Sequence, residues 1–427
     1  MSLSFRNSIM SIYKKRLYGG ALQFTIVFSL LGLMMLSLFL VFVRLNALEI
    51  FQGQRQTQLI ENIRSAIVIM ENNPKLFETP SHNFQITNNS SYETEVNIQP
   101  WGFYDAVKIS SSHTQSRLSG IYLFSDNIRK SNMLPSLYLS DPKRYLSVGG
   151  KTYLGNNSYL PAYGVRKAYV GGIGYTRESF VNGNSYKANN ELPELNRKWM
   201  ERYFQVKNII KGSENRINID ELRSDTLTNS FSSPSLVVAC PDDYFLSRHY
   251  FEGNIIICGT KLTFDHTVRL KNCIVFADSI VMNEGFTGEG QFMAKNRIET
   301  GESSVIKVSS VLFMNNTKSS DQIVLGSSTQ FQGEIIVANN TPGGKEALII
   351  ESGCQLIGQV YCNGYCTFDG IIFGSLYTRG FIKRDKKGLY ENYLVNVCID
   401  IERLPVEYNG ISLIDNPLTK NCNEEVF

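Results

Sequence analysis

The chain has 427 residues and a formal net charge of only +3, from 42 basic and 39 acidic side chains. Charged residues make up 19% of the sequence, and the basic cluster at 383–387 is too short for a nucleic-acid-binding surface, so no nucleic-acid partner is expected. The length is sufficient for two or three domains. The many Tyr, Asn, Ser and Gly residues are typical of a β-rich extracytoplasmic protein.

A long apolar segment lies near the N-terminus. No charged residue occurs between Leu17 and Val43, a length that can cross a hydrocarbon core of about 30 Å. Four basic and no acidic side chains precede it, which predicts a cytoplasmic leader at residues 1–20 and places the bulk of the chain outside. A cleaved secretory signal is the alternative interpretation, although no Ala-x-Ala site follows the segment.

The helix is predicted to continue beyond the bilayer. Apolar residues recur in mixed helical spacing from Leu45 to Ile69, and Asn72, Asn73 and Pro74 end the pattern. We therefore expect one transmembrane and amphipathic helix over residues 21–73.

This N-terminus resembles that of type IV pilin-like proteins, of the minor pilin or pseudopilin kind. The resemblance is carried by the basic triplet at 14–16 and by Gly19 and Gly20 before Ala21. It implies proteolytic processing between Gly20 and Ala21. It also implies a bacterial inner-membrane protein with a periplasmic or cell-surface head. The sequence departs from the pattern at Thr25, where most such chains have Glu, and a plain single-pass anchor is the alternative.

Two small residues, Ser29 and Gly32, lie within the apolar segment. Small side chains let helices approach closely in a membrane. We expect this face to pack against the helices of other pilin-like or envelope proteins, in addition to lipid.

Residues 74–232 are predicted to form a β-rich module. A weak six-residue repeat at Val148, Leu154 and Leu160 leaves two interpretations, an early portion of a coil or a small domain that caps one. The segment 192–210 is predicted to be a short amphipathic helix, favoured as a packing brace over a partner-binding helix. Its apolar face would consist of Leu195, Trp199, Tyr203, Phe204 and Val206.

Large apolar residues then recur at every sixth position. One row consists of Leu262, Val268, Ile274, Ile280, Phe286, Phe292 and Ile298, and a second row lies two residues further on. This period fits neither a helix nor a flat sheet, and it is typical of a chain that forms a short strand, turns a corner and repeats. We predict a mainly β protein with a parallel β-helix over residues 233–385, at about six residues per side and about 18 per turn. A cap would follow at 386–427, and an antiparallel sandwich is the alternative.

Two segments near the end of the predicted coil, 374–378 and 389–394, resemble membrane-anchored β-helix proteins of the bactofilin-like or Bacteroidota type. This resemblance implies no chemical activity.

The eight cysteines divide into three groups. Five are assigned to the inward rows: Cys240, Cys258, Cys354, Cys362 and Cys366. A thiol in the interior of a coil acts as a small apolar filler, so free thiols are favoured over disulfides at these positions. Cys273 falls off both rows, and Cys398 and Cys422 form a disulfide if the tail folds back. No second pair or His supports zinc at Cys362 and Cys366, so no metal or other cofactor is expected.

The sequence contains no recognisable catalytic motif, and we assign no catalytic residue. The enzymatic alternative comes from the predicted fold, because many parallel β-helices degrade polysaccharides with outward carboxylates. The side chains considered are Asp242, Asp243, Asp265 and Asp278, with Arg248, Tyr250 and Lys261 beside them. We favour the interpretation that these aspartates are solvated charges at the corners of the coil and not catalytic groups. The expected function is that of a structural or assembly protein, and a polysaccharide-binding or polysaccharide-degrading protein, such as a lyase or hydrolase, is the alternative.

Overall fold

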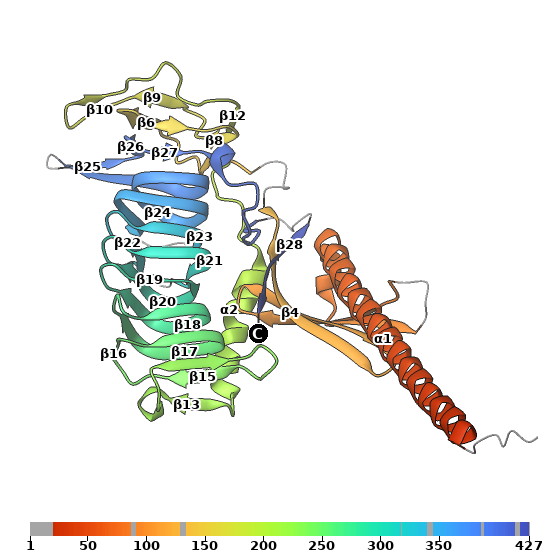
Figure 1. Cartoon of the computed structure of the whole chain (residues 1–427). Helices are drawn as coiled ribbons and strands as arrows, with labels where there is room; N and C mark the ends of the chain where they lie inside the picture. Colours follow the sequence, from red (N-terminus) through yellow and green to blue (C-terminus); the bar gives the residue numbers. More distant parts are fainter. Residues whose placement is uncertain are drawn as a thin grey trace, which may run out of the picture. The chain divides into compact units, whose positions relative to one another are not determined.

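The computed structural model describes residues 20–86, 91–128, 134–316, 318–339, 345–385, 388–414 and 419–426. The protein is mainly β, with 50% strand and 21% helix, and forms a β-solenoid of about ten turns after a long apolar helix (Figure 1). This confirms the predicted parallel β-helix. The chain divides into two compact units, Met1–Glu61 and Asn62–Phe427, each described by itself.

The first unit contains the apolar part of α1. This helix spans Gly20–Asn72, within one residue of the prediction at each end. Over Leu22–Asn72 it is long and apolar enough to cross a membrane, a description that both a membrane anchor and a signal sequence meet. The predicted leader before Gly20 lies outside the described residues.

In the second unit, the end of α1 packs on an antiparallel sheet. Ile63, Ala66 and Met70 follow helical spacing and are buried against the sheet. The sheet has the order β1-β2-β3-β4-β28. Its strands are β1 (Ser81–Phe84), β2 (Tyr92–Trp101), β3 (Tyr104–His113), β4 (Ser116–Asp126) and β28 (Lys420–Val426). We call it the head sheet. β28 comes from the far end of the chain and pairs antiparallel with β4.

A parallel coil forms most of the second unit, from β13 (Arg216–Asn218) to β24 (Glu346–Asp385) (Figure 1). The strands between are β14 (Thr226–Asn229), β15 (Leu236–Ala239), β16 (Tyr244–Leu246), β17 (Tyr250–Phe264), β18 (Arg269–Met282), β19 (Thr287–Gly288), β20 (Gly290–Thr300), β21 (Val305–Met314), β22 (Gln322–Leu325) and β23 (Gln330–Val337). The predicted turn of 18 residues holds early in the coil, where Ile256 pairs with Ile274. Later turns lengthen to 25 residues, since Ile323 pairs with Leu348.

One side of the coil departs from the six-residue pattern. Ile274 and Phe276, predicted to point inward, belong to the outer cluster, whereas Cys273 and Val275 belong to the interior. Asn272 lies at the corner before them with a φ of 52°, and the phase of inward side chains shifts by one residue there. The other six members of the first row lie in the interior cluster as predicted.

The coil also includes chain that precedes it in sequence. β5 (Leu137–Leu139) pairs in parallel with residues 376–378 of β24, and β8 (Ser158–Leu160) and β12 (Ser185–Lys187) stack beyond it. The segment is therefore part of the coil, as one of the two interpretations predicted. It does not form an early portion of the coil, however, because it stacks on the last strand, β24. Figure 1 shows these yellow strands above the blue turns of β24.

Several short strands complete this end of the coil. They are β6 (Leu146–Gly149), β7 (Tyr153–Leu154), β9 (Val165–Lys167), β10 (Tyr169–Val170), β11 (Ile173–Gly174), β25 (Gly388–Glu391), β26 (Tyr393–Val395) and β27 (Cys398–Ile399). β26, β6 and β9 form a small parallel sheet.

The inserted helix, α2 (Arg197–Gly212), packs on the outer side of the coil. It starts later than predicted because the Asn196 side chain accepts a hydrogen bond from the Lys198 N–H and caps it. The Tyr203 ring centroid lies 5.2 Å from those of both Phe276 and Phe313. Phe204 is 45% exposed, so the apolar face is narrower than predicted. α2 is a packing brace.

All eight cysteines are free thiols. Cys398 in β27 and Cys422 in β28 belong to different sheets, so the suggested disulfide between them does not form. Cys258 lies in the outer cluster, contrary to the prediction. Cys273, Cys354, Cys362 and Cys366 fill the interior, and Cys240 is half-buried against the same interior cluster, as predicted.

Candidate functional site

Three of the acidic residues considered for a sugar-degrading face bond to neighbouring side chains or backbone of the coil corners. Asp242 and Asp243 lie in an exposed turn, where Asp242 accepts a hydrogen bond from the Thr260 hydroxyl and Asp243 forms an ion pair of 2.8 Å with Lys261. Asp265 accepts a hydrogen bond of 2.8 Å from the Thr267 N–H and closes its own corner. These contacts stabilise corners of the coil.

Strand register places Asp278 at the same corner as Asp242, two turns further along the coil, with Thr260 on the turn between them. Asp278 lies half-buried on β18 close to Tyr203 of α2. The Arg248 N–H donates to the Thr267 hydroxyl at 2.7 Å, and the Tyr250 hydroxyl donates to Glu252 at 2.6 Å.

Two titratable carboxyl groups near Tyr250, those of Glu252 and Glu289, were not predicted from the sequence. Hydrogen bonds from Lys271 and Tyr250 lower the pKa of Glu252. Burial, together with the nearby Glu424 carboxylate, raises the pKa of Glu289 to about 7. Both carboxyls interact with Lys271, whose Nζ lies 2.8 Å from Glu252 Oε1. Glu289 therefore exchanges a proton near neutral pH.

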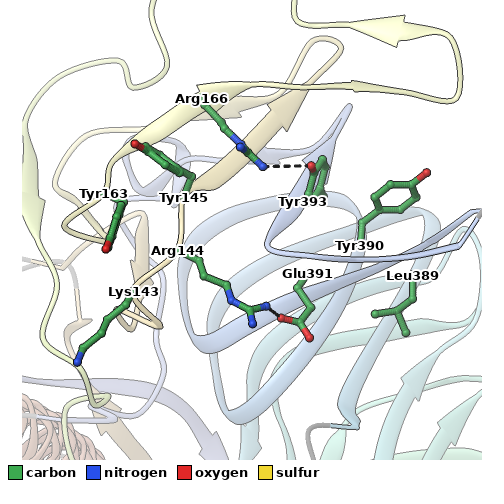
Figure 2. Close-up of a pocket in the computed structure, with 9 residues that line it drawn as sticks. All are labelled: Lys143, Arg144, Tyr145, Tyr163, Arg166, Leu389, Tyr390, Glu391 and Tyr393. Carbon is green, nitrogen blue, oxygen red and sulfur yellow. Dashed lines mark hydrogen bonds and ion pairs between the residues drawn. The ribbon is translucent and has the colours of Figure 1, made fainter.

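The structure places a different group of side chains around a cleft at the end of the coil. The cleft has a volume of about 510 Å³. Figure 2 shows its lining, which comes from the segment between β5 and β6, from β9 with the turn before it, and from β25 and β26. The lining residues are Lys143, Arg144, Tyr145, Tyr163, Arg166, Leu389, Tyr390, Glu391 and Tyr393. We call it the end cleft.

A row of three polar residues crosses the small sheet under the end cleft. Tyr393 of β26 is in register with Ser147 of β6, which is in register with Arg166 of β9. The Arg166 Nε–H donates to the Ser147 hydroxyl at 2.9 Å, and its Nη2 donates to the Tyr393 hydroxyl at 3.4 Å (Figure 2). The guanidinium also lies 5.4 Å from the centre of the Tyr145 ring. These contacts fix its orientation.

Aromatic rings form much of the lining. Tyr145 and Tyr163 meet edge to face with centroids 5.4 Å apart, and Tyr390 and Tyr393 lie 5.2 Å apart. Tyr145 and Tyr163 are 44% and 55% exposed, and Leu389 is 51% exposed. Exposed rings of this kind offer apolar faces with polar hydroxyl ends.

The loops that carry the rings are tied together by Asp141. Its carboxylate accepts hydrogen bonds from the Lys143 N–H at 2.8 Å and the Ala162 N–H at 3.0 Å. Arg144 forms an ion pair with Glu391 across the end cleft (Figure 2). Three basic side chains and one carboxylate therefore line it.

The amino-acid composition of residues 134–190 is the sequence signal from which the end cleft could have been predicted. Residues 134–190 contain seven basic and two acidic side chains, a net charge of +5 against +3 for the entire chain, and eight of the 22 tyrosines. Arg166, Ser147 and Tyr393 are brought together only by strand pairing, which leaves no motif in the sequence.

Comparison with protein families, curated proteins and solved structures finds no match. Among the described residues, no group of three or more His, Cys, Asp or Glu is arranged to hold a metal ion. The pilin-like resemblance stays a prediction.

Proposed function

We propose that the protein is a structural component of a bacterial cell-envelope assembly, of the pilin-like kind. In this proposal α1 anchors the chain in the inner membrane and packs with neighbouring helices, and the β-helix is displayed outside. The observation that carries it is α1 itself. Its first part has no charged residue between Gly20 and Val43 and exposes large apolar side chains, whereas Ile63, Ala66 and Met70 near its other end are buried in the head sheet.

The energetics of the exposed part support this role. Each buried Leu, Phe or Met side chain contributes about 1.5–3 kcal/mol relative to exposure in water, so a helix covered with them is costly to leave in solvent. Polar side chains in the same part bond within the helix: the hydroxyls of Thr25 and Ser29 donate to the Leu22 and Ile26 carbonyls at 2.9 Å. Groups satisfied in this way are compatible with lipid.

The two small residues also support helix packing. Open space surrounds Gly32 where a Cβ would be, and Ser29 lies one turn before it on the same face. Close approach of a second helix along this face would gain dispersion contacts that lipid chains do not supply as well.

The test of processing is mass spectrometry of the mature protein purified from membranes. The proposal expects a new N-terminus at Ala21 and retention in the membrane fraction after alkaline washing. An intact leader with membrane retention would instead indicate a plain anchor, and a soluble product cleaved after Val43 would indicate a secretory signal and end the proposal.

The test of assembly is disulfide crosslinking in membranes through single cysteines at Ser29→Cys or Gly32→Cys. The matched control is Met34→Cys, which lies on the opposite face of the helix. The proposal expects crosslinked products from Ser29→Cys and Gly32→Cys but few from Met34→Cys. Equal or absent crosslinking at all three positions would contradict packing through this face.

A further inference from the structure

We propose that the end cleft binds an anionic polysaccharide whose sugars carry carboxylate groups, such as uronic acids. This goes beyond the anchoring and assembly role and stands independently of it, because it rests on the coil and not on α1.

The charge of the region favours an anionic ligand. Residues 134–190 carry a net charge of +5, although the entire chain carries only +3. Concentrated positive charge raises the local concentration of a polyanion and its rate of association. In the end cleft the excess comes from Lys143, Arg144 and Arg166, with Glu391 as the opposing charge.

The exposed tyrosines favour a sugar. Among the described residues, the tyrosines that are strongly exposed are Tyr145, Tyr163, Tyr169 and Tyr186, and all four lie in this one region. The C–H face of a pyranose ring is apolar and slightly positive, so it packs on the electron-rich face of an aromatic ring, while the phenol hydroxyl bonds to a sugar hydroxyl. Two of them, Tyr145 and Tyr163, contact each other in the lining of the end cleft, and exposed apolar rings of this kind are typical of a binding surface.

Arg166 is suited to hold a carboxylate. Its Nε and Nη2 are bound by Ser147 and Tyr393, and Tyr145 lies against the guanidinium plane. The residue nevertheless remains exposed, and these two hydrogen bonds use Nε and Nη2, so Nη1 is available to a ligand. Because the side chain is already fixed, binding loses little conformational entropy, and a charge-assisted pair with a carboxylate is stronger than a neutral hydrogen bond.

Glu391 argues against a nucleic acid as the ligand. Its carboxylate lies in the wall of the end cleft beside Arg144, where it repels any anion, and the repulsion is greatest for a backbone with one charge on every phosphate and no hydroxyl donors between them. A polysaccharide presents hydroxyl groups along its length, and Glu391 and the tyrosine hydroxyls can accept hydrogen bonds from them. The phosphate backbone of a nucleic acid offers only acceptors.

The experiment measures binding by the full-length protein in detergent micelles with three probes: a short oligogalacturonate, a neutral cello-oligosaccharide of the same length, and a short single-stranded DNA. We expect saturable binding of the oligogalacturonate that weakens with salt, and weaker binding of the other two. Arg166→Gln should reduce this affinity about tenfold or more, since a lost charge-assisted contact exceeds about 1.4 kcal/mol. Tyr163→Ala should also reduce it severalfold, because it removes a ring on which a sugar packs.

The matched controls lie on other surfaces. Arg117→Gln removes an exposed arginine from the head sheet, and Phe245→Ala removes a ring that is 55% exposed on β16. Neither should change the affinity. The proposal is overturned if the oligogalacturonate does not bind below about 1 mM, if the neutral sugar or the DNA binds more tightly, or if the cleft variants behave as the controls do.

Discussion

Glu334 and Tyr408 are joined by a hydrogen bond of 2.9 Å in the interior of the second unit, where both side chains are buried. Glu334 lies on β23, and Tyr408 lies in the chain that follows the coil. The Ile411 N–H donates to the same carboxyl oxygen at 3.2 Å. Burial raises the pKa of Glu334 to about 8, although these two hydrogen bonds oppose the shift. The carboxyl is therefore mostly protonated at neutral pH.

This predicts a pH-dependent stability that Glu334→Gln removes. The pKa is raised from 4.5 to about 8, so the folded state holds the proton more tightly. The stability it contributes is complete below the unfolded pKa and declines as pH rises through about 8. Glutamine keeps the acceptor for Tyr408 and cannot ionise, so urea unfolding between acidic and alkaline pH should show a flatter profile. Glu407→Gln, at an exposed neighbouring site, should retain the decline of the natural sequence.

A second prediction concerns the buried ion pairs of Asp105. Its Oδ2 lies 2.8 Å from Lys420 Nζ, and Oδ1 contacts Arg202. Burial alone would raise the pKa of Asp105, but Lys420 and Arg202 outweigh it and hold the pKa well below its usual range. This stabilisation is present above pH of about 4 and is lost as the pH falls.

Asp105→Asn should cost about 3–5 kcal/mol at neutral pH, since it leaves buried cations with less compensation. Chemical unfolding of the two proteins measures the loss. Glu95→Gln removes an ion pair of 3.2 Å with Arg117 on the surface, and it should cost about 0–1 kcal/mol. Similar losses for the two variants would contradict the role assigned to burial.

A third prediction follows from a column of glycines on successive turns of the coil. Gly358 has a φ of 137°, and a Cβ there would lie 2.0 Å from the Gly333 carbonyl oxygen. Gly358→Ala therefore meets both backbone strain and a fixed clash, and a loss of at least about 2 kcal/mol is expected. Gly212→Ala, at the end of α2 with open space around it, should have little effect on the midpoint of thermal unfolding.

A fourth prediction concerns thiol reactivity. Burial raises the pKa of Cys354 to about 11 and that of Cys362 to about 12, and both side chains are fully enclosed. Because the thiolate is the reactive form, neither should be alkylated in the folded protein at mildly alkaline pH, whereas both should react in denaturant. Peptide mass spectrometry measures this. The same maps under non-reducing conditions should contain no Cys398–Cys422 crosslink, and finding one would contradict the separation of β27 from β28.

The sequence by itself determined the two elements that are encoded as local periodicities. An uncharged apolar run followed by helical spacing specifies α1, because every residue in it contributes to one continuous helix. Side chains such as Phe286 and Phe292 recur at sixes because each corner of a coil repeats the same geometry, and they lie in the interior as expected. Both signals are read from neighbouring residues.

Only the tertiary structure decided which outer side chains of the coil are covered and which distant segments lie together. Phe276 lies on the outer side of the coil, where its ring stacks on Tyr203 of α2, a helix some 70 residues earlier in the chain. β5 completes the coil by pairing with β24, and the end cleft joins Arg166 to Tyr393 across the small sheet. Parallel pairing between distant segments is set by backbone hydrogen bonds that are common to all residues. No local pattern records it, and so the candidate binding site emerged only when the chain was folded.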